Sequence, residues 1–177
     1  MSRLVLRDIT IRPLHQEELE LLGQMNRDWD KGRPLALHVE RLAMQQEGKA
    51  VYLFAWHQER PVGHVLLMLT GPSKEPMRSA LRNCAHISDL FVVPDCWSQG
   101  IGTRLMDEAE ALAAHHGSVQ VGLDVAIDND RAMTMYERRG YIDMGFGERA
   151  VSWTYIDPEG QQQVQNDVLV YLVKLLS

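Results

Sequence analysis

Residues 86–104 constrain the fold of this chain more than any other stretch. They read His-Ile-Ser-Asp-Leu-Phe-Val-Val-Pro-Asp-Cys-Trp-Ser-Gln-Gly-Ile-Gly-Thr-Arg. An apolar, β-prone run over 87–93 stops at Pro94, and after a short polar turn Gly100-Ile101-Gly102 opens a helix. The first N–H groups of a helix lack intrahelical partners and carry partial positive charge, and glycine lets an anion approach the backbone. The stretch therefore predicts a strand, a phosphate-binding loop and a helix N-terminus.

The residues after this loop extend the same pattern. One stripe at the helical period contains the apolar residues Ile101, Leu105, Met106, Ala109, Leu112 and Ala113, and His116 falls within the same stripe. Residues 119–127 then alternate between apolar and polar side chains and predict a second strand. Asp128-Asn129-Asp130 caps another helix over 131–139, which ends at Gly140. This order of strand, loop, helix, strand and helix is typical of nucleotide-cofactor sites.

Two segments of this region carry recognisable motifs. The first, LFVVPDCWSQGIGTRLM, contains the Val-x-Pro strand ending and the Gly-x-Gly loop. The second, LDVAIDNDRAMTMYERRGY, contains the run Asn-x-x-Ala-x-x-x-Tyr-Glu-x-x-Gly-aromatic at Asn129, Ala132, Tyr136, Glu137, Gly140 and Tyr141. Together they resemble the GNAT superfamily of acetyl-CoA-dependent N-acyltransferases. The resemblance is sharp over residues 85–145, and outside them the order of elements agrees.

The resemblance implies an α/β (α+β) fold of one domain over residues 1–177. Its mixed, mostly antiparallel sheet would have about seven strands, a splay between the fourth and fifth, and about four flanking helices. From the sequence pattern we expect a strand over 5–12, helices over 13–30 and 34–46, a hairpin over 50–56 and 62–70, and strands over 141–147, 150–156 and 168–176.

Residues 71–84 interrupt the step from the third strand to the fourth. Pro76 predicts the start of a short helix that places Arg78 and Arg82 on one face. Two interpretations stay open for this insertion. It forms a lid or a contact for an acidic group, or it is a mobile excursion at the surface.

The resemblance also implies which residues bind acetyl-CoA. A free main-chain N–H on the fourth strand would hold the thioester carbonyl, and Asn129 would bond the pantetheine arm, which is compatible with a simple N-cap. The expected cofactor-binding residues are Phe91, Val92, Val93, Trp97, Ser98, Gln99, Gly100, Ile101, Gly102, Thr103, Asn129 and Tyr136.

The loop departs from the family pattern at two positions. Trp97 stands where the family usually has Arg or Gln, and Ser98 replaces a frequent glycine. Gln99 offers a polar side chain instead. Because backbone N–H groups make most pyrophosphate contacts in this family, we expect the site to survive these changes.

Acetyl transfer to an amine needs a neutral amine, a donor for the carbonyl oxygen and an easy thiolate departure. Tyr136 matches the family tyrosine and is the expected catalytic acid. For the base there are three candidates. Asp124 ranks slightly above Asp89, and His86 is the third, although a lone histidine at a strand start is usually structural.

Composition and charge narrow the class of protein. Hydrophobic residues make up 45% and charged residues 24% of the 177 residues, as in an ordinary globular protein. The formal net charge of −6 disfavours a nucleic-acid partner. Cys84 and Cys96 make neither a metal-binding spacing nor a disulfide framework. They therefore indicate a reducing compartment and no metal site. No apolar run has the length of a membrane span. We expect a cytoplasmic protein with no metal and no membrane partner.

The resemblance implies an N-acetyltransferase that uses acetyl-CoA as co-substrate and acetylates a primary amine directly, in a ternary complex. A small-molecule amine is the favoured acceptor, a protein N-terminus or lysine is the alternative, and a homodimer is one option for the assembly. A second hypothesis is a CoA-binding module without catalysis, which Trp97 supports and Tyr136 and Asn129 oppose. A dinucleotide-binding fold is disfavoured because the loop lacks the G-x-G-x-x-G spacing.

Overall fold

An eight-stranded mixed sheet organises the part of the chain that the computed structural model describes, which is residues 8–25, 33–157 and 159–177. Its strands are β1 (Ile9–Pro13), β2 (Ala50–His57), β3 (Arg60–Met68), β4 (Cys84–Val92), β5 (Gln120–Ala126), β6 (Ile142–Asp143), β7 (Arg149–Ile156) and β8 (Gln162–Leu175). They lie in the order β1-β2-β3-β4-β5-β8-β6, and β7 pairs with β8 outside this path. The pair β4–β5 is parallel and the other pairs are antiparallel.

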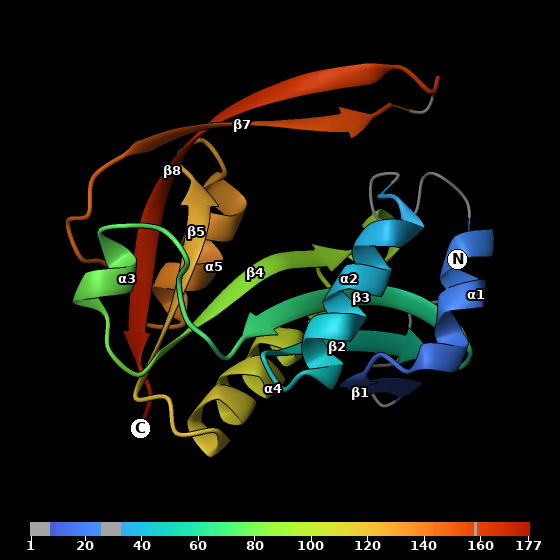
Figure 1. Cartoon of the computed structure of the whole chain (residues 1–177), viewed down its shortest axis with the longest axis horizontal. Helices are drawn as coiled ribbons and strands as arrows, with labels where there is room; N and C mark the ends of the chain where they lie inside the picture. The colour runs from blue at the N-terminus through green and yellow to red at the C-terminus, as the bar shows by residue number, and fades with distance from the viewer. Residues whose placement is uncertain (1–7, 26–32, 158) are drawn as a thin grey trace.

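Helices cover both faces of this sheet (Figure 1). In the described residues they are α1 (Leu19–Gln24), α2 (Leu35–Gln46), α3 (Met77–Ala80), α4 (Ile101–His115) and α5 (Asp130–Arg138). Successive side chains of a strand point to opposite faces, so β3 shows which helix lies where. The ring of His64 lies 6.3 Å from that of His38 on α2, whereas a Cβ built on Gly63 would be 3.3 Å from Cδ1 of Leu105 on α4. Helices α2 and α4 therefore pack on opposite faces.

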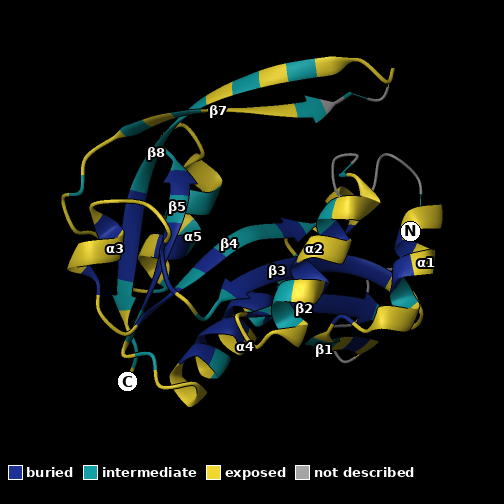
Figure 2. Ribbon diagram, in the orientation of Figure 1, coloured by how far each residue is buried: buried dark blue, intermediate teal, exposed yellow. Residues whose placement is uncertain are grey.

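The core is deepest along β2 and β3, as the burial colours in Figure 2 show. Four consecutive residues of β2, Tyr52 to Ala55, are completely buried, so both faces of this strand are covered. The far half of the β7–β8 hairpin differs, because its side chains are largely exposed and include Trp153 and Val164. Figure 1 shows this hairpin standing apart from the rest of the sheet.

A buried charged network fixes α5 against α4. Arg139, just after α5, donates from Nη2 to Asp107 Oδ1 (2.7 Å) and from Nε to Glu110 Oε1 (3.1 Å), both on α4. The hydroxyl of Tyr141 donates to the same Glu110 oxygen at 3.0 Å, and Lys174 Nζ lies 2.6 Å from its other oxygen. A buried carboxylate is tolerated when it is paired in this way. The network fixes the C-terminal end of α5 against the middle of α4.

The predicted fold class is confirmed, but three elements differ in length. The last strand begins at Gln162 instead of residue 168, because the polar residues 162–167 pair with β7 although they lack an apolar pattern. The strand predicted over 141–147 is reduced to β6, which Gly145 and Gly147 follow with φ of 78° and 81°. The helix predicted over 13–30 is the short α1, preceded by a 3-10 turn. Residues 1–7 and 26–32 of these predictions lie outside the described residues.

The insertion at 71–84 packs on the sheet. Its helix α3 contributes to a small apolar cluster whose buried members are Met77, Leu81, Cys84, Tyr171 and Val173. The prediction that Arg78 and Arg82 share a helical face is wrong, because α3 ends at Ala80. Arg78 pairs instead with Glu75, its Nε lying 2.9 Å from Oε1. The segment therefore covers part of the sheet, and its arginine is already engaged by an acidic neighbour.

Candidate active site

Strands β4 and β5 separate part-way along their length (Figure 1). They pair only over residues 84–87 and 120–123. Beyond this point β4 continues to Val92 beside β3, and β5 continues to Ala126 beside β8. The facing edges of the two strands then carry main-chain N–H and C=O groups that the sheet does not pair with each other. This is the predicted splay between the fourth and fifth strands.

Main-chain groups of β4 point into this gap at alternate residues. The N–H of Val93 donates to Val62 O at 3.0 Å, towards β3. The main-chain groups of Val92 therefore face the gap. Its carbonyl oxygen accepts the indole N–H of Trp97 at 2.6 Å. Of the three residues expected to hold the thioester carbonyl, Val92 has the N–H with the required direction.

The glycine loop and the first turn of α4 follow β4. Gly100 is the N-cap residue with φ of 81°, a conformation that favours glycine. The N–H of Arg104 donates to Gly100 O at 3.1 Å, so the N–H groups of residues 101–103 precede the helical ladder. A Cβ on Gly102 would lie 3.8 Å from Cγ2 of Val92, which is ordinary contact. The fold itself thus tolerates a small side chain at Gly102, and glycine keeps this turn open towards β4.

The residues that depart from the family pattern have defined roles in the loop. Trp97 is half exposed, with 50% of its surface accessible, although its indole N–H is bonded. Gln99 Nε2 donates to Asp95 O at 3.0 Å, so its amide holds the loop. Ser98 has φ of 58°, in the region that glycine adopts most easily, which explains why a glycine suits this position.

Helix α5 carries two of the expected site residues. Asn129 is its N-cap residue, and Tyr136 lies in its last turn. Asn129 Oδ1 accepts the N–H of Ala132 at 3.1 Å, so its expected N-cap role is confirmed. The buried ring of Tyr136 lies 5.7 Å from that of Tyr141. Burial raises the pKa of Tyr136 to about 12, against a small opposing effect of Arg139. The phenol therefore keeps its proton at neutral pH, as an acid must.

Asp89 lies in a β-bulge of β4. Residues 88–91 stand opposite the shorter stretch 64–66 of β3, and Asp89 has φ of 61°. The bulge turns its carboxylate to α2, where Arg41 forms an ion pair with it, and Arg33, just before this helix, forms a second one. Burial by itself raises the pKa of Asp89, but Arg41 and Arg33 outweigh burial and hold this pKa below its ordinary value. A carboxylate held in this state is a weak proton acceptor.

Asp124 belongs to a second network, which joins β4, β5, β7 and β8. It forms an ion pair with Arg149 and stands opposite Tyr171 on β8. The Tyr171 ring crosses over Gly122, where a Cβ would be 2.4 Å from the hydroxyl oxygen, and this oxygen lies 3.0 Å from Nδ1 of His86. Burial lowers the pKa of His86, Asp124 opposes this effect and Arg149 adds to it. His86 is therefore neutral at physiological pH.

The sequence interpretation missed the arginine partners of both carboxylates and also Tyr171. These partners are Arg33 and Arg41 for Asp89 and Arg149 for Asp124. Each joins a residue on another strand or helix, so no local spacing identifies it. Gly122 was the available signal, because an isolated glycine in a strand indicates a close approach of another group. Arg131 was missed as well, and its guanidinium carbon lies 4.6 Å from the centre of the Trp97 ring.

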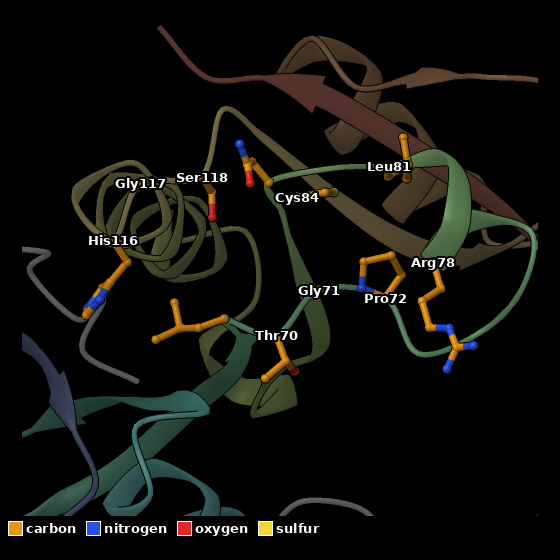
Figure 3. Close-up of a pocket in the computed structure, with 11 residues that line it drawn as sticks. Thr70, Gly71, Pro72, Arg78, Leu81, Cys84, His116, Gly117 and Ser118 are labelled. Carbon is orange, nitrogen blue, oxygen red and sulfur yellow. The ribbon is translucent and has the colours of Figure 1, made fainter.

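A pocket of about 270 Å³ lies elsewhere, at the C-terminal end of α4 (Figure 3). It is lined by the turn at 69–72, by Arg78 and Leu81, and by residues 83–84 and 116–118. Helix α4 has 15 residues. At 1.5 Å per residue this pocket is roughly 20 Å from the glycine loop. It does not belong to the candidate active site.

Comparisons with known proteins agree with this geometry. The sequence model of the acetyltransferase (GNAT) family matches residues 12–141. N-alpha-acetyltransferase 30 of Schizosaccharomyces pombe is 25% identical over 133 residues, which are 75% of this chain and 83% of that protein. The crystal structure of ribosomal-protein-alanine N-acetyltransferase from Brucella melitensis has a TM-score of 0.69 at 17% identity, covering 94% of this chain and 99% of that one. PaiA N-acetyltransferase from Thermoplasma acidophilum, solved with coenzyme A, has a TM-score of 0.63 at 17% identity, covering 92% and 97%.

The family match extends over most of the chain. It runs from the end of β1 to Tyr141, just before β6, and so includes the β4–β5 gap, the glycine loop and the N-cap of α5. The structural similarities, at identities below 25%, support the same fold. The chain therefore belongs to the GNAT family of acetyltransferases and is an N-acetyltransferase that uses acetyl-CoA as its acetyl donor.

Proposed function

We propose that this enzyme acetylates a small cationic primary amine by direct attack in a ternary complex. The observation that carries the proposal is that the two faces of the β4–β5 gap carry different groups. The first turn of α4 lies on one face, beside Val92. Asp89 points to α2 on the other face. His86 stands opposite Met68 of β3. Met68 is four residues after His64, so both side chains, and with them His86, lie on the α2 face of the sheet. Donor and acceptor can therefore approach the gap from opposite faces at the same time.

The state of the two cysteines supports direct transfer. Cys84 and Cys96 are both buried. Burial raises the pKa of the Cys84 thiol to about 11 and also raises that of Cys96. Because the thiolate is the nucleophile, neither group is ready to form an acyl-enzyme at neutral pH.

In the proposed mechanism the main-chain N–H of Val92 donates to the carbonyl oxygen as negative charge develops on it. Tyr136 gives its proton to the departing thiolate of CoA, and its raised pKa keeps that proton available. Asp124 accepts the proton of the amine, directly or through water. Asp89 is the weaker candidate for this step because Arg41 and Arg33 hold its pKa low.

One face of the β7–β8 hairpin suits a cationic acceptor. Every second residue of β7 lies on one face. The face that carries Arg149, the partner of Asp124, therefore also carries Val151, Trp153 and Tyr155. The rings of Trp153 and Tyr155 are 5.5 Å apart, and Trp153 Nε1 donates to Asp167 Oδ2 at 2.7 Å. Aromatic faces beside a carboxylate attract positive charge. This favours an acceptor with a second ammonium group besides the amine that reacts.

A protein N-terminus is the second candidate acceptor. The names of two similar proteins favour it, since one is an N-alpha-acetyltransferase and the other a ribosomal-protein-alanine N-acetyltransferase. An N-terminus offers one amine and an extended peptide, whereas a polyamine offers several amines and little else. The two acceptors can therefore be separated by experiment.

Release of free CoA thiol from acetyl-CoA, measured against a panel of amines, tests the proposal. The panel holds diamines, polyamines, amino sugars and short peptides with free or blocked N-termini. We expect release with the small polycationic amines and little with the peptides. Asp167→Asn should raise the KM for the amine and leave the KM for acetyl-CoA unchanged. Release with peptides alone would establish the second candidate, and no release with any amine would contradict both.

A cytoplasmic location and independence from metal ions stay predictions. Among the described residues, the structure has no helix of the length and apolar character that a membrane crossing requires. Thiol release in the presence of a chelator would test the second prediction, which expects an unchanged rate.

A further inference from the structure

Arg131 and Trp97 meet beside the glycine loop, although they come from different elements. Arg131 is exposed in the first turn of α5, two residues after Asn129, and Trp97 belongs to the turn that follows β4. The guanidinium carbon of Arg131 lies 4.6 Å from the centre of the indole ring. The indole N–H is fixed to Val92 O at 2.6 Å. The ring is thereby held in a set orientation and offers its face to the cation.

The contact places the positive charge of Arg131 beside the loop position that Trp97 occupies. Trp97 occupies the place where the resemblance expects an arginine or glutamine. The acidic residues Asp95 and Asp130 lie close by in the same two segments. Arg104, in the first turn of α4, donates to the carbonyl of Ile9 at 2.9 Å and so is directed to β1. A phosphate at the loop would benefit from a further cation.

We propose that Arg131, held on Trp97, contacts a phosphate group of CoA and selects the phosphorylated donor. A guanidinium held over the face of an aromatic ring bonds through the ring's π electrons and keeps its N–H donors available for phosphate oxygens. Bonds of this kind are charge-assisted and stronger than neutral ones. The inference rests on acetyl-CoA as the donor and adds to it a specificity residue on α5.

Calorimetric titration of CoA, 3′-dephospho-CoA and pantetheine into the full chain tests this proposal. The variant is Arg131→Gln, and the control is Arg138→Gln, an exposed arginine at the other end of the same helix. We expect Arg131→Gln to weaken CoA binding about ten-fold and to leave pantetheine binding unchanged, because pantetheine has no phosphate. A loss that persists for 3′-dephospho-CoA assigns the contact to the pyrophosphate, and a loss that disappears assigns it to the 3′-phosphate.

The role of the indole ring is tested by combining variants. Trp97→Ala should weaken CoA binding, and Arg131→Gln should add little in that background, because the ring no longer holds the guanidinium. Trp97→Arg combined with Arg131→Gln should restore the affinity by returning a cation to the loop. Trp97→Ala weakening CoA while Arg131→Gln has no effect would mean that the ring stacks on the adenine instead.

The outcomes separate this proposal from the proposed function. No binding of CoA to the unaltered chain would contradict acetyl-CoA use at this loop. Binding to the unaltered chain with an equal dissociation constant for Arg131→Gln would overturn only the role of Arg131. An equal loss for CoA and pantetheine would also overturn it, since the effect would then not depend on phosphate.

Discussion

The two faces of the β4–β5 gap are built in different ways. The proposed function assigns the α4 face to the acetyl donor and the α2 face to the acceptor, and we call them the donor side and the acceptor side. The donor side consists of main-chain groups from one short segment, residues 92–104, and of a helix cap in the next helix. The acceptor side depends on charged and polar side chains that meet over long stretches of chain. Arg33 and Asp89 are 56 residues apart, Arg149 and Asp124 are 25 apart, and His86 and Tyr171 are 85 apart.

This difference predicts different sensitivities. The donor side should respond to changes of backbone shape and steric access, because its hydrogen-bond donors are backbone N–H groups. The acceptor side should respond to changes of charge and pH, because its contacts are ion pairs and a neutral histidine. Substitutions on each side can therefore break or sharpen the contrast.

Gly102→Leu should have the largest effect. A leucine side chain at this position would extend towards Val92 and Leu90, across the opening at the first turn of α4. We expect acetyl-CoA affinity to fall roughly a hundred-fold, or about 2.8 kcal/mol. The matched control is Gly102→Ala, whose Cβ the fold accepts at 3.8 Å from Val92 Cγ2. A stabilisation of Gly102→Leu by acetyl-CoA as large as that of the unaltered enzyme, measured as the shift in Tm, would place the phosphates elsewhere.

Asp124→Asn should change turnover more than Asp89→Asn does. A positioned base contributes roughly 10²–10⁴-fold, and the proposed mechanism gives this role to Asp124. The measurement is the pH dependence of kcat/KM for the amine in both variants. Equal profiles for the two variants would show that neither carboxylate is the base and would direct attention to His86.

Tyr136→Phe should lower kcat by about 10²-fold and leave the KM for acetyl-CoA nearly unchanged. The variant removes one hydroxyl and keeps the buried ring. The CoA thiol resembles cysteine, with a pKa of about 8.5, so the thiolate can depart partly unaided and the loss stays moderate. Because burial raises the pKa of Tyr136 to about 12, the phenol should keep its proton at neutral and mildly alkaline pH. An unchanged kcat in a variant with normal Tm would show that Tyr136 has a structural role only.

Asp89→Asn should have its main effect on stability, and the effect should depend on pH. The folded pKa of Asp89 lies below the ordinary value of 3.8. The ionised carboxylate therefore adds stability above about pH 4, and this contribution is lost as pH falls through the folded pKa. Removing one partner of a buried ion pair costs about 3 kcal/mol. Urea unfolding should show the full difference at pH 7 and a smaller one near pH 3, and a difference that stays constant would exclude the ion pairs as its cause.

The donor side could be predicted from the sequence because its signals are local. The helix expected at residues 100–102 begins at Ile101, and the cap expected at Asn129 is present. A left-handed N-cap and a side chain that bonds a nearby N–H depend on a few adjacent residues. What remained hidden on this side is the contact between Arg131 and Trp97, since it joins two elements.

The acceptor side could not be predicted to the same depth. Strict alternation from Ile87 would place Asp89 on the same face as Ile87, but the bulge turns its carboxylate to α2. The hairpin gave a weak pattern because residues 162–167 are largely polar, so its pairing with β7 was not evident. Register and bulges depend on partner strands, and a single sequence does not record them directly.

Determining a crystal structure of the enzyme with bound CoA would test the contrast between the two faces most directly. We predict that the pyrophosphate oxygens lie about 3 Å from the main-chain nitrogens of residues 100–103. The thiol end should enter the gap beyond residues 87 and 123, with Val92 N–H directed towards it. CoA bound in the pocket at the C-terminal end of α4, or with its phosphates on the face that carries Asp89, would contradict the assignment of the donor side.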